Sequence, residues 1–250
     1  MTRPVQLVPS FDGVTTGSSV LVEGDEAHHA VAVRRLRVGE QVVLTDGAGG
    51  STVGTVAATG KRVMQVTTGA VVRAPRPQPE VTVVQAIPKG ERGELAVEVL
   101  TEIGVDRIVP WAADRSVAVW RGERAARSLA KWRATAREAA KQARRSWFPE
   151  VADLAATPEV AALLADADLA LVLHEDAAES LAGVLSGGPV PESGRVVLVV
   201  GPEGGLTEAE VTAFVAEGAR AVRLGQEVLR TSTAGVAAVA AVLSRTGRWA

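Results

Sequence analysis

The feature that most constrains the fold is an apolar run, residues 196–200, that ends abruptly on Gly-Pro-Glu-Gly-Gly at residues 201–205. Residues 224–234, Leu-Gly-Gln-Glu-Val-Leu-Arg-Thr-Ser-Thr-Ala, follow a second short apolar run in the same way. In an open α/β sheet, ligands bind in a crevice at the carboxyl ends of the strands. The two glycine-marked loops therefore predict such a crevice.

Composition narrows the classes of protein. The chain has 250 residues, of which 47% are hydrophobic, so one large or two modest domains can form a real core. It contains no cysteine, which excludes a disulfide framework, a cysteine-based zinc site and a thiol nucleophile. Neither a signal-peptide layout nor an apolar run near the roughly 18 residues that span a bilayer is present. We expect a soluble cytoplasmic protein.

A proline-rich segment marks the domain boundary. Prolines at alternate positions 75, 77 and 79 favour polyproline II and forbid a helix. We therefore predict a first domain over residues 1–73, a linker over 74–80 and a second domain over 81–250.

The two sides of this linker differ in pattern. Before it, the strand-like runs 20–22, 41–45, 51–57 and 62–72 are interrupted by one helix-like insert, 25–36, which predicts a small β-barrel. After it, strands and helices alternate, which predicts an α/β fold with a mostly parallel sheet and helices on both faces. Its expected strands are 81–87, 106–110, 169–173, 195–200 and 221–224. Its expected helices are 91–103, 123–143, 177–185, 207–217 and 231–244.

The glycine loop at 201–205 leads into a Thr-x-x-Glu capping box formed by Thr207 and Glu210. Its glycines would let a ligand approach the backbone closely. It matches neither the P-loop nor the dinucleotide fingerprint. A tight turn without a ligand remains an alternative.

Cationic residues are concentrated between residues 121 and 145. This segment contains nine cationic residues and two carboxylates, so its local charge is +7 in a chain whose formal net charge is −2. Such one-sided charge is the electrostatic footprint of a nucleic-acid partner, although a solvated helix face is the alternative. Trp132 and Trp147 lie within or beside the cluster, where they could stack on bases. The nine cations are Arg121, Arg124, Arg127, Lys131, Arg133, Arg137, Lys141, Arg144 and Arg145.

The histidines do not indicate a metal site. His28, His29 and His174 would have to converge from separate domains without supporting carboxylate spacing, so we expect no metal. His174 ends an apolar strand, where it could line the crevice or cap a helix. Arg115 follows another strand and could bind a phosphate or carboxylate, or pair with Asp114.

The chain as a whole resembles the RsmE family of 16S ribosomal RNA uridine-N3 methyltransferases, in the SPOUT (trefoil-knotted) superfamily. The resemblance depends on the order and spacing of many short pieces over nearly the whole chain. They are His28-His29, Arg35, Gly39, Asp46-Gly47, residues 102–105, Arg115-Ser116, Glu138-Ala139, Gln142, Arg145, Pro149, residues 198–205, Leu224-Gly225 and residues 229–231.

The resemblance implies a PUA-like barrel that binds RNA, and a knotted domain that binds S-adenosyl-L-methionine as a homodimer. The implied product is 3-methyluridine in 16S rRNA of the small ribosomal subunit. The implied cofactor residues are Leu173, His174, Glu175, Val200, Gly201, Pro202, Glu203, Gly204, Gly205, Leu224, Gly225, Leu229, Arg230, Thr231, Ser232 and Ala234.

The resemblance also indicates roles for the cations. Arg230 is the first catalytic candidate, because a cation would stabilise the anion formed when uridine N3 loses its proton. Arg115 and Arg145 are further candidates. Family members often carry glutamate where this chain has Ser232, so the proton acceptor is open, with Glu203 as one substitute. The candidate RNA-binding residues are Arg34, Arg35, Arg37, Arg137, Lys141 and Arg144.

Other functions stay open at this stage. Ribose 2′-O methylation is a rival reaction, against which the barrel argues. A non-catalytic ribosome-assembly factor that keeps the fold is an alternative from another class, and the serine at position 232 supports it. A nucleotide-binding regulator is disfavoured by the missing phosphate loops.

Overall fold

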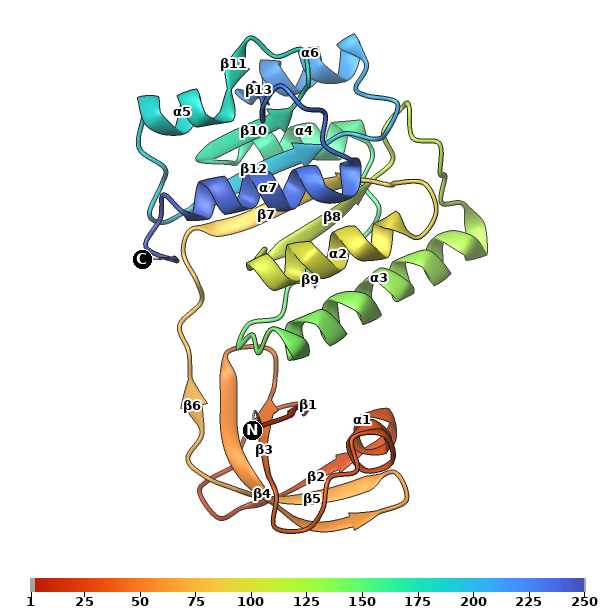
Figure 1. Ribbon diagram of the computed structural model, residues 1–250, viewed down its shortest axis with the longest axis vertical. Coiled ribbons are helices and arrows are strands. Elements are labelled where there is room, and N and C mark those ends of the chain that lie inside the picture. Colours follow the sequence, from red (N-terminus) through yellow and green to blue (C-terminus); the bar gives the residue numbers. More distant parts are fainter. Residues whose placement is uncertain (1–2, 250) are drawn as a thin grey trace. The chain divides into compact units, whose positions relative to one another are not determined.

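The computed structural model describes residues 3–249, which form two compact units (Figure 1). The first comprises Met1–Arg76 together with Ala140–Phe148, and the second comprises Pro77–Ala139 and Pro149–Ala250. The first crossing between the units lies inside the predicted linker. The return of residues 140–148 to the first unit was not predicted, because that segment continues a helix begun in the second.

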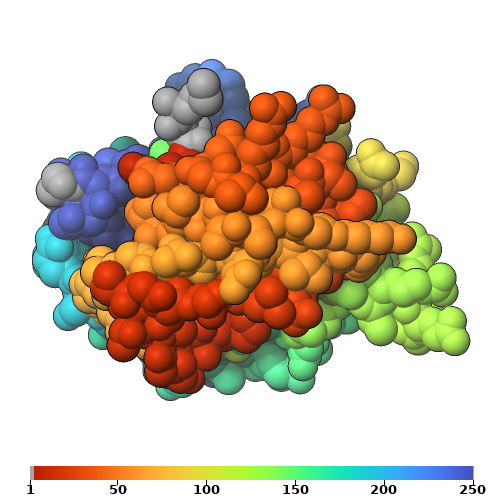
Figure 2. All heavy atoms as spheres, turned by 90° about the horizontal axis from the view of Figure 1, so that it is seen from below, coloured from red at the N-terminus to blue at the C-terminus, as the bar shows by residue number. Residues whose placement is uncertain are grey.

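The first unit is a six-stranded sheet. Its strands are β1 (Val5–Leu7), β2 (Ser19–Glu23), β3 (Gln41–Thr45), β4 (Gly50–Gly60), β5 (Val63–Thr68) and β6 (Val72–Arg73). Their order is β1-β3-β4-β5-β2, with β6 paired to β4. All pairs are antiparallel except β1 with β3. Figure 2 looks onto this unit, whose atoms are coloured from red to orange.

A helical insert closes one side of the first core. The predicted helix over 25–36 is observed as a short α-helix, α1 (Gly24–His28), and a π-helical turn, η1 (His29–Val33). Their alanines Ala27 and Ala30 are fully buried with Leu44, Met64 and Val66 of the sheet. Small side chains are needed at these two positions because the helical backbone lies close to the strands.

Residues 140–148 complete the first unit. The Trp147 indole packs so closely on Gly49 that an added Cβ there would lie 2.7 Å from the ring. The indole N–H also donates to the Ala74 carbonyl at 3.0 Å. Phe148 covers Gly47, and its N–H donates to the Gly47 carbonyl. The two glycines are therefore seats for aromatic rings that lie a hundred residues further along the chain.

The second unit is built on a seven-stranded parallel sheet, which confirms the predicted fold class. The strands are β7 (Glu80–Ala86), β8 (Arg107–Trp111), β9 (Glu150–Val151), β10 (Leu169–Leu173), β11 (Glu179–Ser180), β12 (Arg195–Val200) and β13 (Arg220–Arg223). Their order is β11-β13-β10-β12-β7-β8-β9, and every pair is parallel. The two-residue edge strands β9 and β11 were not predicted because they are too short for a pattern.

Helices cover both faces of this sheet. The helices are α2 (Arg92–Ile103), α3 (Gly122–Gln142), α4 (Thr157–Ala165), α5 (Leu181–Gly187), α6 (Glu208–Ala216) and α7 (Thr231–Leu243). One core packs α2, α3, α5 and α7 against the sheet, and the other packs α4 and α6 against its opposite face. Strand β12 serves both, with Leu198 in the first core and Val199 in the second. Burial on both faces explains its continuous apolar run. Helix α4 was not predicted.

A buried ion pair ties the end of the chain to the sheet. Arg248 donates to the Asp106 carboxylate at 2.6 Å and to the carbonyls of Pro79 and Gly104. The side chains of Arg248 and Asp106 are 10% and 5% exposed. None of the helices within residues 3–249 combines the length and the apolar character needed to cross a membrane.

Candidate active site

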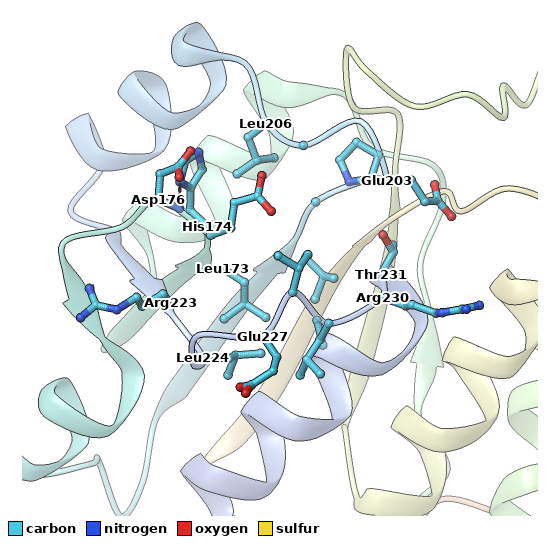
Figure 3. Close-up of a pocket in the computed structure, with 18 of the residues that line it drawn as sticks. Leu173, His174, Asp176, Glu203, Leu206, Arg223, Leu224, Glu227, Arg230 and Thr231 are labelled. Atoms are coloured by element: carbon cyan, nitrogen blue, oxygen red, sulfur yellow. Dashed lines mark hydrogen bonds between the residues drawn. The ribbon is translucent and has the colours of Figure 1, made fainter.

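A pocket of about 720 Å³ lies at the carboxyl ends of β10, β12 and β13, which are neighbours in the sheet (Figure 3). Its walls are three loops, residues 173–176, 200–206 and 222–231, completed by Ala234, Arg92 and Arg115. The volume falls in the range of roughly 300–1,000 Å³ that is typical of small-molecule sites. The crevice predicted from the glycine loops is therefore present.

The segment after the glycine loop is held by a local capping box and by one long-range hydrogen bond. Thr207 and Glu210 form the expected capping box: the Thr207 hydroxyl accepts from the Glu210 N–H, and the Glu210 carboxylate accepts from the Thr207 N–H at 2.8 Å. The other Glu210 oxygen accepts from the Asp114 N–H at 2.8 Å. This buried carboxylate thus fixes both the start of α6 and the segment that follows β8.

Arg115 braces the same loop. Its guanidinium donates to the Leu206 carbonyl at 3.1 Å and to the Gly204 carbonyl at 3.5 Å. An added Cβ at Gly204 would lie 2.8 Å from the Arg115 carbonyl oxygen, so only glycine allows the two backbones to approach this closely. Arg115 lines the pocket, and its hydrogen bonds give it a loop-shaping role.

The pocket is electrostatically divided. Glu175, Asp176 and Glu227 come from the loops after β10 and β13. In Figure 3, Arg230 and Glu203 extend to the other side, with Thr231 between them. The first side also holds Arg223, which the Ala177 and Ala178 carbonyls engage. Its carboxylates outnumber this one cation, so the first side suits a cationic ligand group, and the second suits a developing negative charge close to a carboxylate.

His174 has a local structural role as well as a place in the pocket wall. Its Nδ1 accepts from the Asp176 N–H at 3.2 Å, which caps the turn after β10. Arg223, the last residue of β13, donates to the carbonyls of Ala177 and Ala178 and so holds the same turn. His174 therefore lines the pocket and caps a turn. The alternative that it caps a helix is wrong, because the next helix, α5, has Ser180 as its N-cap.

Ser232 differs from the other residues proposed for the cofactor: they all line the pocket and it does not. Its side chain points into the protein, its residue is 2% exposed, and within the described residues its Oγ has no hydrogen-bond partner. Nearby, the fully buried Gln85 donates to the carbonyls of Ala86 and Thr231. The serine therefore offers no group to a ligand in the pocket.

The three catalytic candidates are placed differently. Arg230 is the exposed N-cap residue of α7 and lines the pocket, as does Arg115. Arg145 belongs to the first unit, where its Nε donates to the Trp147 carbonyl at 2.8 Å. Sequence reasoning missed Arg92, a pocket residue at the start of α2. Its position just after the carboxyl end of β7 was the available signal.

The predicted RNA-binding residues also divide. Arg34, Arg35, Arg37, Arg137 and Arg144 are exposed. Lys141 is 9% exposed, and its ammonium lies 2.8 Å from the Glu26 carboxylate. Its interpretation as an RNA ligand is revised to a structural ion pair, because the charge is already neutralised inside the first unit.

The expectation that Trp132 stacks on bases is wrong. Trp132 is 2% exposed and packs edge-on against Trp120 with ring centroids 5.0 Å apart. Its indole also covers Gly93 of α2. Trp132 belongs to the buried apolar face of an otherwise basic helix. Trp147 is part-buried on Gly49, with the Arg76 guanidinium 5.5 Å from its ring centroid.

No group of three or more histidine, aspartate or glutamate side chains within residues 3–249 is arranged to hold a metal ion.

Comparison with known proteins identifies the class. Residues 75–243 match the family described as RNA methyltransferase domain, and residues 22–67 match the RNA methyltransferase PUA domain. The first match spans nearly the whole second unit, including all three pocket loops. Fold and pocket together define an RNA methyltransferase with an α/β methyltransferase domain and a PUA domain.

Relatives specify the family. A ribosomal RNA small subunit methyltransferase E of Mycobacterium bovis is 44% identical over 238 residues, which is 94% of this chain and 89% of that protein. The Bacillus subtilis protein of the same name is 28% identical, covering 90% of each chain. A Neisseria gonorrhoeae methyltransferase E, solved bound to S-adenosyl methionine, has a TM-score of 0.85 at 28% identity, covering 97% of this chain and 98% of that one. The chain belongs to the ribosomal RNA small subunit methyltransferase E (RsmE) family.

Proposed function

We propose that this enzyme transfers the methyl group of S-adenosyl-L-methionine to N3 of one uridine in 16S rRNA of the small ribosomal subunit. The observation that carries the proposal is the pocket, because three loops at neighbouring strand ends form it in a chain of this family. The chemistry of its walls supports the choice of cofactor.

The pocket residues fit S-adenosyl-L-methionine. The cofactor carries a sulfonium and an ammonium but no phosphate, and the carboxylates of Glu175, Asp176 and Glu227 suit those cations. Leu173 and Leu224 offer apolar contacts for the adenine ring. The glycines at 201, 204 and 205 leave backbone groups open to it. When bound, the cofactor supplies an electrophilic methyl group.

The protein must make uridine N3 nucleophilic. N3 carries a proton, and losing it leaves a negative charge spread over the uracil ring. Arg230 and Arg92 both line the pocket, and no hydrogen bond or ion pair within residues 3–249 engages either guanidinium. We assign Arg230 to stabilising that charge, as preorganised donors do at oxyanion holes.

RNA binding is assigned to exposed cations of both units. Arg34, Arg35 and Arg37 follow the helical insert of the first unit, and Arg35 has a left-handed backbone with φ 57°. Arg137 lies on α3, and Arg144 lies just beyond it. Phosphate contacts by such residues would supply affinity without reading sequence. We also propose that the enzyme works as a homodimer, as the family resemblance implies.

The test is methyl transfer to a defined substrate. The protein is incubated with isotope-labelled S-adenosyl-L-methionine and small subunits that lack the modification, and digested nucleosides are analysed by mass spectrometry. Labelled 3-methyluridine is expected. Labelled 2′-O-methyl nucleoside would replace the proposed reaction, and cofactor binding without any transfer would make the chain a ribosome-assembly factor. Light scattering coupled to gel filtration checks the dimer.

A further inference from the structure

The transfer reaction needs a group that accepts the N3 proton, and the pocket offers few. Its carboxylates are Glu175, Asp176, Glu203 and Glu227. Ser232 cannot take this role, because a hydroxyl is a poor base and its side chain is buried away from the pocket. The choice therefore depends on which carboxylate lies beside the cations that stabilise the uracil anion.

Glu203 meets that condition. It extends to the same side of the pocket as Arg230, whereas Asp176 and His174 lie together across the pocket (Figure 3). Glu175 belongs to the turn after β10 with Asp176, and Glu227 belongs to the loop after β13. These three carboxylates suit the cationic groups of the cofactor, which leaves Glu203 for the substrate.

One hydrogen bond aims the Glu203 side chain. Its Oε1 accepts from the backbone N–H of Lys89 at 3.1 Å. A single restraint fixes the carboxylate between the glycine loop and the segment that leads into α2, and leaves its second oxygen available as an acceptor. The same segment carries Arg92 into the pocket wall. The cationic side chains that line the pocket with Glu203 are Arg92, Arg115, Arg223 and Arg230.

We propose that Glu203 is the general base of the methyl transfer, an inference that rests on the proposed function. The N3–H bond breaks and its proton moves to the free carboxylate oxygen of Glu203. The N3 electron pair forms the new bond to the methyl carbon, and the electrons of the methyl–sulfur bond return to sulfur. Arg230 and Arg92 hold the uracil charge while the proton and the methyl group exchange places.

The test compares pH–rate profiles under single turnover with saturating cofactor. Removing a general base typically slows a reaction about 10²–10⁴-fold, so Glu203→Gln should lose that much at neutral pH. The variant then depends on uridine that has ionised in solution. Its rate should rise about tenfold per pH unit, because each unit raises the hydroxide concentration tenfold. The wild-type rate should stay level over the same range.

A more acidic substrate gives a second readout. Small subunits reconstituted with 16S rRNA containing 5-fluorouridine present an N3 that ionises more readily. They should rescue Glu203→Gln far more than they accelerate the wild type. Glu217→Gln is the matched control: it removes an exposed carboxylate outside the pocket and should keep the wild-type rate and pH profile. Glu227→Gln removes a carboxylate assigned to the cofactor, so at saturating cofactor it should keep the wild-type shape of the pH profile. Thermal unfolding followed by circular dichroism verifies that each variant is folded.

The outcomes are distinct. If the wild type forms 3-methyluridine while Glu203→Gln keeps its rate, or is slowed by a factor that is constant with pH, Glu203 is not the base. If the wild type forms no 3-methyluridine, the proposed function itself fails. If 5-fluorouridine rescues Glu227→Gln and not Glu203→Gln, Glu227 is the general base instead.

Discussion

Helix α3 and the rim of the pocket are both rich in cations, yet their cations are used differently. Along α3, Arg127 pairs with Glu123, Lys131 with Glu94, Arg133 with Asp153 and Lys141 with Glu26. In the pocket, Arg92 and Arg230 have no such partner within the described residues. Four of the six cations of α3 are therefore engaged by carboxylates, whereas Arg92 and Arg230 are free to act on a ligand.

This difference shows what a count of charges can and cannot predict. A local excess of +7 predicts a positive electrostatic potential around α3, but it does not predict which cationic side chains are free to bind a ligand. Availability depends on carboxylates that are distant in sequence, such as Glu26 and Asp153. The variants below separate the two uses, from the largest expected effect to the smallest.

Arg230→Ala should lower turnover the most. Loss of one preorganised donor to a developing anion typically costs about 10²–10³-fold in rate. Cofactor affinity should change little, because the loops after β10 and β12 remain. Single-turnover kinetics and calorimetry measure the two quantities. Arg245→Ala, an exposed arginine beyond the other end of α7, is the control. A loss of cofactor affinity as large as the loss of rate would make Arg230 a binding residue.

Lys141→Met should destabilise the protein without acting on RNA. Removing one partner of a buried ion pair typically costs about 3–5 kcal/mol, and we expect about 2–3 kcal/mol here because Glu26 keeps some contact with solvent. Its side chain is 21% exposed. Urea unfolding measures the change.

Lys131→Met is matched to this variant, since its ion pair with Glu94 has the same 2.8 Å length on the same helix, but the Lys131 side chain is 59% exposed. Its stability should stay close to that of the wild type. Equal losses of unfolding free energy in both variants would show that burial does not make the Lys141 ion pair more stabilising than the Lys131 pair. Lys141 would then again be a candidate RNA-binding residue.

Arg137→Ala should produce the smallest effect, a modest loss of RNA affinity. Each phosphate contact contributes about 0.7–0.9 to the slope of log affinity against log salt, and the variant should lose one such increment. Filter binding to small-subunit RNA over a salt series measures the slope. Arg133→Ala should leave the slope unchanged, because Arg133 already donates to Val151 and Asp153. An unchanged slope for Arg137→Ala would place RNA elsewhere.

Local sequence patterns were sufficient to predict most strands and helices of the second unit. Strands such as β12 are buried on both faces and therefore read as continuous apolar runs, while Thr207 and Glu210 announce the start of α6. Because the loops at parallel strand ends meet at one edge, the pocket walls followed from the strands. Arg92 was missed because its position after β7 was the one signal for it, and the loop before α2 carries no capping motif.

Other features depend on contacts that no local pattern records. Ser232 and Trp132 lie on helices where sequence alone does not say which face is buried. Both side chains are buried, and Trp132 packs on Gly93. The sequence does not distinguish Lys141 from the other cations of α3, because its partner Glu26 lies far away in the sequence. The short strands β9 and β11 form by pairing with β8 and β13 at the two edges of the sheet, which is a long-range contact.

The return of residues 140–148 to the first unit has a consequence for how the chain is made. The rings of Trp147 and Phe148, which pack on Gly49 and Gly47, are synthesised after the whole of α3. During synthesis at about 5–20 residues per second, the N-terminal unit must wait several seconds with those seats open before it can close. Its final packing is therefore a late event, and a fragment that ends at residue 76 would lack the pieces that complete it.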